Sequence, residues 1–130
     1  MKTLILLLLF ALGSSVMASA QTTESFTLKA GKKMTAKKSK LKIRFISVTE
    51  DSRCPEGVNC IWAGNAKVKV EVIGARSTQI FEFNTNAGPK GNQLEGWAIT
   101  IDSLTPYPKS GVTLDPKKYS AKFTITRLQR

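Results

Sequence analysis

The segment KVKVEV, residues 67–72, alternates charged and apolar side chains at every position. A period of two places Val68, Val70 and Val72 on one face of an extended chain and the charged residues on the other. This pattern predicts a β-strand with one buried face. Because the same alternation returns elsewhere, we expect six to seven strands, six of them covering residues 26–29, 41–45, 67–72, 81–83, 97–101 and 121–126.

After the first twenty residues almost nothing shows the 3.6-residue period of a helix, and Gly and Pro separate the short strands. We therefore expect an all-β fold, either an antiparallel β-sandwich or a closed barrel. Phe45 and Ile46 are adjacent apolar residues that break the alternation and predict a bulge. The residues expected in the core are Phe26, Leu28, Ile43, Phe45, Val68, Val70, Val72, Phe81, Phe83, Trp97, Ile99, Ile101, Phe123 and Ile125.

Two connections between the expected strands differ in kind. Residues 74–77 predict a compact hairpin loop in which Gly74 takes a positive φ. Residues 84–96 are rich in Gly and Asn and predict a thirteen-residue loop without regular structure. Such long loops are uncommon in compact domains and are functional or mobile. This segment is therefore a candidate binding loop, through Asn86, Lys90 and Asn92.

The chain begins with the features of a secretory signal peptide. Lys2 supplies positive charge, residues 4–12 form a short apolar run, and residues 18–20 are the small residues Ala-Ser-Ala that suit cleavage. The run is too short for a membrane-spanning helix, and no second one follows. We expect residues 1–20 to be removed and residues 21–130 to form a single β-rich domain, secreted or periplasmic and without a transmembrane segment.

The charge of the chain is strongly positive, with 20 Lys and Arg against 9 Asp and Glu and a formal net charge of +11. The expected cleavage removes one lysine and no acidic residue, which leaves +10. In an exported protein such a charge favours anionic envelope lipid or polysaccharide, or an acidic envelope protein. Nucleic acid is not an expected partner, because the chain leaves the cytoplasm.

Eight of these cations lie in a stretch that we name the basic segment, residues 29–44, which contains no acidic residue. Lysines along a sheet edge block unwanted strand pairing, which is one interpretation of the segment. The other is a landing surface for a diffuse anionic partner, to which flexible lysines are suited. The candidate binding residues here are Lys32, Lys33, Lys37 and Lys38.

Cys54 and Cys60 are the two cysteines of the chain, and five residues separate them. In an exported protein we expect them to form a disulfide with each other. A zinc site would require four ligands, and the chain has no histidine to add to two cysteines. A redox dithiol would favour the spacing C-x-x-C, which is absent. We therefore expect no metal and no cofactor.

The absence of histidine also argues against an enzyme. A nucleophilic cysteine would lack its base, and proton transfer near neutral pH would depend on carboxylates or lysines. The nine acidic residues are scattered, and the adjacent Glu50 and Asp51 point to opposite faces of a strand. No pair of carboxylates is indicated for glycoside hydrolysis, and we expect no enzymatic activity.

The segment around the cysteines, DSRCPEGVNCIWAG at residues 51–64, resembles the signature of a family of small exported bacterial proteins of unknown function. Those proteins share a DSRCPxGVxCxWAG segment followed by an alternating valine strand. The resemblance extends over most of residues 21–130, because residues 104–108 and the closing strand also fit it. It implies an exported β-rich domain and no assigned activity.

Two interpretations of residues 51–64 stay open. In the first, Arg53 forms a fork with Asp51 or Glu56, and Trp62 packs against the disulfide or the end of a sheet. The segment is then a rigid crossover between two sheets. In the second, it is a ligand-binding rim in which Arg53 and Trp62 contact a partner.

Two functions of different classes follow from these residues. One is a non-catalytic binding or structural module of the bacterial cell envelope, whose basic segment contacts anionic lipid or polysaccharide. The other is a secreted inhibitor or ligand of another protein, which acts through the disulfide-closed loop. Salt-sensitive capture of lipid or polysaccharide from an envelope extract would favour the first, and one stoichiometric protein would favour the second.

Overall fold

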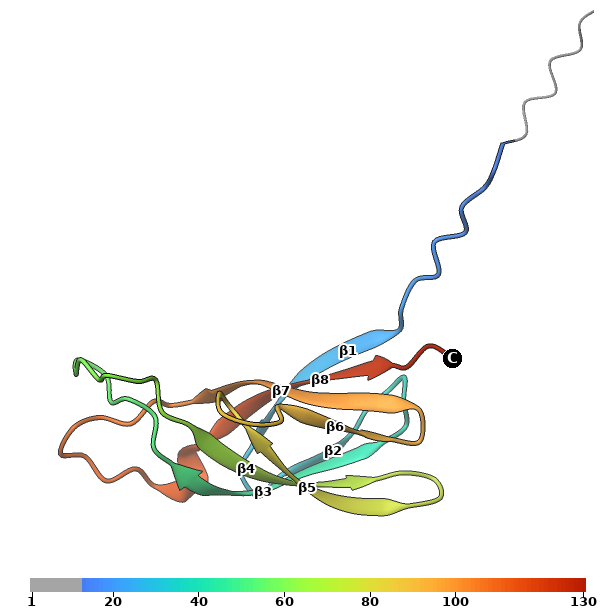
Figure 1. Cartoon of the computed structure of the whole chain (residues 1–130). Coiled ribbons are helices and arrows are strands. Elements are labelled where there is room, and N and C mark those ends of the chain that lie inside the picture. The colour runs from blue at the N-terminus through green and yellow to red at the C-terminus, as the bar shows by residue number, and fades with distance from the viewer. Residues whose placement is uncertain (1–12) are drawn as a thin grey trace, which may run out of the picture.

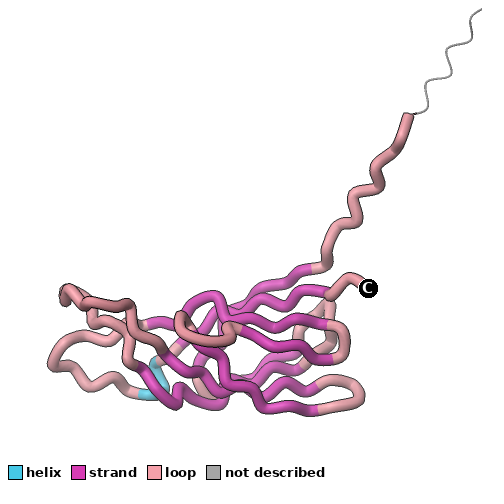
Figure 2. Tube along the Cα trace, viewed as in Figure 1, coloured by secondary structure: helices cyan, strands magenta, loops and turns pink. Residues whose placement is uncertain are grey.

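Eight antiparallel strands form two four-stranded sheets in the computed structural model, which describes residues 13–130 (Figure 1). One sheet has the order β1-β8-β7-β6 and the other the order β2-β3-β4-β5. Loops and a single short 3-10 turn, η1, connect them (Figure 2). The elements are β1 (Thr23–Lys29), β2 (Lys33–Thr35), β3 (Lys42–Asp51), β4 (Ala66–Ile73), β5 (Thr78–Asn84), β6 (Gly91–Leu94), β7 (Trp97–Thr105), η1 (Pro116–Lys118) and β8 (Ser120–Arg127).

The expected strands are all present, and two short ones were missed. β2 and β6 have three and four residues and lie at the edges of their sheets, so the expected count of six to seven is wrong. Residues 84–96 were expected to lack regular structure, which is also wrong because they include β6. Within residues 13–130 the strands form two open sheets, and the closed-barrel alternative is wrong.

The two sheets pack face to face around one core. The ring of Phe45 on β3 meets the ring of Phe123 on β8 edge-on, with centroids 6.2 Å apart. Both side chains are fully buried, and rings in this arrangement attract beyond the effect of burial alone. Of the residues expected in the core, Phe26 on β1 and Phe81 on β5 are only partly buried; the others are buried, including Leu28 and Phe83 on the same two edge strands.

Strand β3 is irregular, as the break in its alternation predicted. Its pairing with β4 shifts between Phe45 and Ser47 and again between Val48 and Glu50. After the second shift Asp51 pairs with the fully buried Ala66. Cross-strand partners share a face of the sheet, so the carboxylate of Asp51 points toward the core side.

The hairpin loop at residues 74–77 is confirmed, with the amide of Gly74 donating to the carbonyl of Ser77 at 2.8 Å. The expected positive φ of Gly74 is wrong, since this glycine is not among those with φ above zero. Its small size is what matters: a Cβ atom here would lie on the carboxylate of Glu95. The glycine therefore makes room for a side chain from the other sheet.

Glu24 on β1 binds the turn between β2 and β3 and so joins the two sheets. Its carboxylate accepts from the amides of Lys37, Lys38 and Ser39 at 3.0 to 3.3 Å. Burial alone would raise the pKa of this group, but the hydrogen bonds from Ser39, Lys38 and Lys37 outweigh it and lower the pKa. Glu24 is therefore held ionised under the turn.

The strand order gives the sandwich two different ends (Figure 1). The hairpin end carries the turns β2–β3, β4–β5 and β6–β7, together with the start of β1 and the end of β8. The loop end carries the connections of residues 52–65, 85–90 and 106–119. The expected signal peptide falls mainly on residues outside the described part; residues 13–20 are exposed and have no regular structure.

Replacing Glu24 by Gln removes the charge that accepts three backbone hydrogen bonds. We expect the free energy of unfolding to fall by about 1 to 3 kcal/mol at pH 7, measured by urea denaturation. Since its pKa is lowered in the fold, the contribution is present above the unfolded pKa near 4.5 and disappears as pH falls through the folded pKa. Glu50→Gln, at an exposed ion pair with Lys67, is the matched control. Equal stability of the two variants would contradict the role of Glu24.

Candidate functional site

The stapled loop, residues 52–65, links β3 to β4 and is closed at its base and at its middle. The amide of Ser52 donates to the carbonyl of Asn65 at 2.7 Å, and the amide of Asn65 returns a bond to the hydroxyl of Ser52 at 3.2 Å. Farther out, Cys54 and Cys60 form the expected disulfide. Gly64 has φ +69, and a Cβ atom there would overlap the Ser52 carbonyl. The two arms therefore approach as closely as backbone allows.

Arg53 lies inside the base of this loop with 5% of its surface exposed. Its Nε and one terminal nitrogen each donate to the Asp51 carboxylate at 2.8 Å, so the expected fork is formed with Asp51. The terminal nitrogens also donate to the carbonyls of Leu104 and Pro106. Its guanidinium lies 4.5 Å from the ring centre of Tyr107. The structure thus places Arg53 as an internal brace between the stapled loop and the end of β7.

Tyr119 completes this buried cluster by donating its hydroxyl to Asp51 at 2.8 Å. Burial would raise the pKa of Asp51, but hydrogen bonds from Arg53 and Tyr119 outweigh it and lower the pKa. For Tyr119, burial and the bond to ionised Asp51 together raise the pKa to about 12. The Asp51 carboxylate accepts hydrogen bonds from Arg53 and Tyr119, and the phenol of Tyr119 stays protonated. Groups held in this way stabilise the fold rather than exchange protons.

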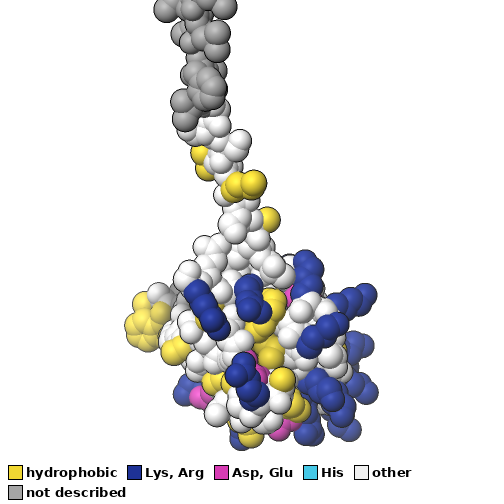
Figure 3. Space-filling view, turned by 90° about the vertical axis from the view of Figure 1, so that its right-hand side faces the viewer, with side chains coloured by type: hydrophobic (Ala, Val, Ile, Leu, Met, Phe, Trp, Pro, Cys, Tyr) yellow, Lys and Arg dark blue, Asp and Glu magenta, His cyan; other side chains and the backbone are white. Residues whose placement is uncertain are grey.

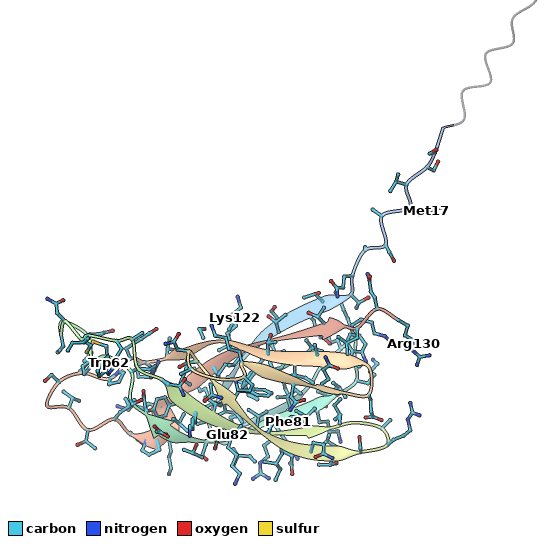
Figure 4. All side chains as sticks on the ribbon, in the orientation of Figure 1. Met17, Trp62, Phe81, Glu82, Lys122 and Arg130 are labelled. Atoms are coloured by element: carbon cyan, nitrogen blue, oxygen red, sulfur yellow. A yellow bond between two sulfur atoms is a disulfide. The ribbon has the colours of Figure 1, made fainter. Side chains whose placement is uncertain are left out.

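Trp62 at the tip of the stapled loop is 76% exposed and Ile61 is 90% exposed (Figure 4). The expectation that Trp62 packs against the disulfide or a sheet end is wrong. The loop is closed by its disulfide and its own backbone bonds, which leave the indole ring outside. Val58, Tyr107 and Val112 are also exposed. The amide of Glu56 binds the carbonyl of Pro108, so residues 106–112 lie beside the stapled loop at this end.

Three hydrogen-bonded asparagines, Asn65, Asn84 and Asn86, stabilise the base of the stapled loop. Of these, Asn65 and Asn84 were not predicted from the sequence. Asn65 donates to the side chain of Asn84 at 2.9 Å and accepts from the amide of Asn86 at 3.0 Å. The amide group of Asn86 donates to the Gly64 carbonyl at 3.1 Å. Asn86 is therefore a brace of the loop base. The clue available in the sequence was only that Asn is frequent in turns.

Lys90 and Asn92 are not brought to this base. The carbonyl of Lys90 accepts from the amide of Ile101 at 2.8 Å, and Asn92 pairs with Ile99 in the middle of β7. Both side chains are exposed. The candidate residues of the segment 84–96 are therefore separated: Asn86 contacts the base of the stapled loop, Asn92 lies on the edge strand β6, and Lys90 directly precedes that strand.

The basic segment forms a second surface, away from the stapled loop. Lys33 pairs with Arg44, and both are exposed on the outer face of the β2–β3 pair. Lys37 and Lys38 lie in the β2–β3 turn at the hairpin end, which Figure 3 views directly and where Lys and Arg side chains gather. A shallow hollow of about 490 Å³ is lined by Gly31, Lys32, Lys33, Arg44, Glu71 and Ile73.

The candidate residues therefore do not form one site: Trp62 is exposed at the tip of the stapled loop, Arg53 and Asn86 brace its base, the four lysines lie in the basic segment, and Lys90 and Asn92 lie at or beside β6. Within residues 13–130 no group of three or more His, Cys, Asp and Glu could hold a metal ion. No helix in that range is long and apolar enough to cross a membrane. Comparison of the chain with protein-family models, with characterised proteins and with solved structures gives no match.

The Tyr119 hydroxyl predicts a specific loss of stability in alkali. Since its folded pKa of about 12 lies above its ordinary value of 10.0, its contribution is complete below pH 10 and is lost as pH rises toward 12. We expect the difference in unfolding free energy between the parent and Tyr119→Phe to shrink over this window. Urea denaturation of both proteins between pH 8 and pH 12 measures this difference. The other groups that titrate in alkali are the same in both proteins, so their effects cancel in the difference. A constant difference would refute the assignment.

Proposed function

We propose that this protein is a non-catalytic, exported binding module of the bacterial cell envelope, and that its basic segment contacts anionic lipid or polysaccharide. The signal-peptide pattern and the disulfide support export. The resemblance of residues 51–64 to small exported bacterial proteins supports an origin in the envelope. The lack of histidine, and the use of Asp51 in a closed structural cluster, support a role without catalysis.

One observation carries the proposal: the cations of the basic segment are free of acidic partners. The ion pairs within residues 13–130 join Arg53 to Asp51, Lys67 to Glu50 and Arg76 to Glu95, and none includes a residue of the basic segment. Glu24, the acidic residue bound to the β2–β3 turn, accepts from backbone amides. The ammonium group of Lys38 donates to the carbonyl of Thr23 at 3.0 Å, but none of these ammonium groups is neutralised by a carboxylate in those ion pairs, which leaves their charge to attract an anionic surface.

The turn that carries Lys37 and Lys38 is also fixed in place before any partner binds. Glu24 holds the backbone at three amides, and Leu41 donates to the hydroxyl of Ser39. A surface presented by a fixed turn loses less conformational entropy on binding than a mobile one. This arrangement favours a binding role over a purely solvated edge.

Replacing Lys32, Lys33, Lys37 and Lys38 by Gln tests the proposal on vesicles. Each lysine near an anionic membrane contributes about 1 kcal/mol, so affinity for phosphatidylglycerol vesicles should fall by about 100-fold or more. Binding by the parent should weaken with salt, as the Debye length falls from about 10 Å at 0.1 M to about 3 Å at 1 M. Co-sedimentation with anionic and neutral vesicles measures both effects.

The matched control removes four charges elsewhere, by replacing Lys109, Lys117, Lys118 and Lys122, all of them exposed, with Gln. The two quadruple variants have equal net charge, so a difference between them reports position. If both lose affinity equally, total charge alone drives binding and the basic segment has no special role. If the parent binds no anionic surface at low salt, the proposal fails.

A second function is favoured by the tip of the stapled loop. Ile61 and Trp62 form a large exposed apolar surface on a loop whose shape is fixed by a disulfide. Tryptophan is enriched among the residues that dominate protein interfaces, and a rigid loop pays little entropy on binding. The protein would then be a secreted inhibitor or ligand of another protein, inserting this tip into a cleft.

The two cysteines and Trp62 separate this second function from the first. We expect Cys54→Ala/Cys60→Ala to lower the free energy of unfolding by about 2 kcal/mol, from the seven-residue loop that the bridge closes, while the sandwich stays folded.

A stoichiometric protein partner captured from an envelope extract should be lost with Trp62→Ala and retained with the quadruple variant at residues 32–38. Salt-sensitive lipid capture that is unchanged by Trp62→Ala would count against the second function.

A further inference from the structure

Three of the five arginines of the chain meet at the hairpin end, around one hollow. We name it the arginine hollow; its volume is about 930 Å³, and its lining residues are Arg76, Glu95, Gly96, Arg127, Leu128 and Arg130. These residues come from three segments: the β4–β5 turn, the β6–β7 turn, and the end of β8 with the residues after it. Since these segments lie far apart in the sequence, the cluster exists only in the folded chain.

The fold places Arg127 against a buried ring and anchors the backbone of Arg76, whose side chain is 88% exposed. Arg127 pairs with Trp97 across β8 and β7, and its guanidinium lies 5.1 Å from the centre of that buried ring. The amide of Arg76 donates to Glu95 at 2.7 Å, and its Nε lies 3.6 Å from the same oxygen. The amide of Leu128 donates to the carbonyl of Gly96 at 2.9 Å. This bond holds the residues that precede Arg130 at the rim of the hollow.

The hollow has an excess of positive charge. Glu95 is the one acidic side chain that lines it, and it is engaged with Arg76. Arg127 and Arg130 have no carboxylate partner in the ion pairs found within residues 13–130. A second hollow of about 320 Å³ adjoins this one through Arg76 and Glu95 and adds Lys40 and Lys42 to its rim. The single negative charge of Glu95 is outnumbered by the arginines and lysines around the two hollows, which leaves this end positive.

We infer that the arginine hollow binds a phosphate group. A guanidinium presents a planar fork of N–H donors that fits the oxygens of phosphate, whereas a lysine acts as a point charge. The ring of Trp97 is buried under Arg127, so it offers no open face on which a sugar could stack, and recognition falls to the oxyanion. The inference rests on the proposed function and adds to it a shaped site beside the diffuse charge of the basic segment.

Isothermal titration of the protein (residues 21–130) with inorganic pyrophosphate tests the inference. We expect saturable binding, and at least tenfold weaker binding by Arg76→Gln/Arg130→Gln, whose side chains are exposed so that the fold should be kept. Lys117→Gln/Lys118→Gln removes two charges at the loop end and should bind as the parent does. Arg127→Lys keeps the charge but loses the fork, and should also bind more weakly. Absence of binding by the parent, or equal loss in the arginine and lysine pairs, overturns the inference.

A competition experiment identifies the source of the phosphate and separates this inference from the proposed function. If pyrophosphate weakens attachment of the protein to phosphatidic acid vesicles, the arginine hollow binds lipid phosphate. If attachment is unchanged while pyrophosphate still binds, the arginine hollow binds a soluble phosphate compound. The quadruple lysine variant at residues 32–38 should keep its affinity for pyrophosphate. Vesicle binding that depends on those lysines, together with pyrophosphate binding that does not depend on Arg76 and Arg130, would retain the proposed function and refute the hollow.

Discussion

The buried ion pair between Asp51 and Arg53 is the interaction on which the loop end depends. Removing two charges from water is costly, and the cost is offset only when both groups have further partners. Here the guanidinium also binds the carbonyls of Leu104 and Pro106, and the carboxylate also accepts from Tyr119. One pair therefore joins the stapled loop, the end of β7 and Tyr119, the residue between η1 and β8. A lysine in place of Arg53 would reach too few of these acceptors.

The alternation of polar and apolar residues was sufficient to predict the interior of this sandwich, because a strand with one solvent-exposed face and one buried face must alternate in this way. It located β1, β3, β4, β5, β7 and β8, and the break at Phe45 and Ile46 located the irregularity in β3. It failed for β2 and β6, whose three and four residues are too few to show a period. These edge strands form because a neighbouring strand offers hydrogen bonds, and a neighbour in space is not visible in a short sequence window.

The surfaces were predicted less well than the core, for a related reason. The basic segment is continuous in the sequence and was therefore recognised from it, whereas Arg76, Glu95 and Arg127 become neighbours only where two hairpin turns meet the end of β8. Gly74 was read as a turn glycine, but its role is to leave space for Glu95. In one of the two interpretations of residues 51–64, Trp62 was expected to pack against the disulfide or the end of a sheet; its exposure follows from a loop that is closed by its own disulfide and backbone bonds.

The two tryptophans of the chain stand at opposite ends of the sandwich in opposite environments. Trp62 is in solvent on the stapled loop, and Trp97 is buried at the hairpin end under a guanidinium. Indole emission shifts to longer wavelength in water, so the spectrum contains two separable components, one quenched by soluble iodide or acrylamide and one protected. Changes in either component would report which end of the molecule has been engaged, without any attached label.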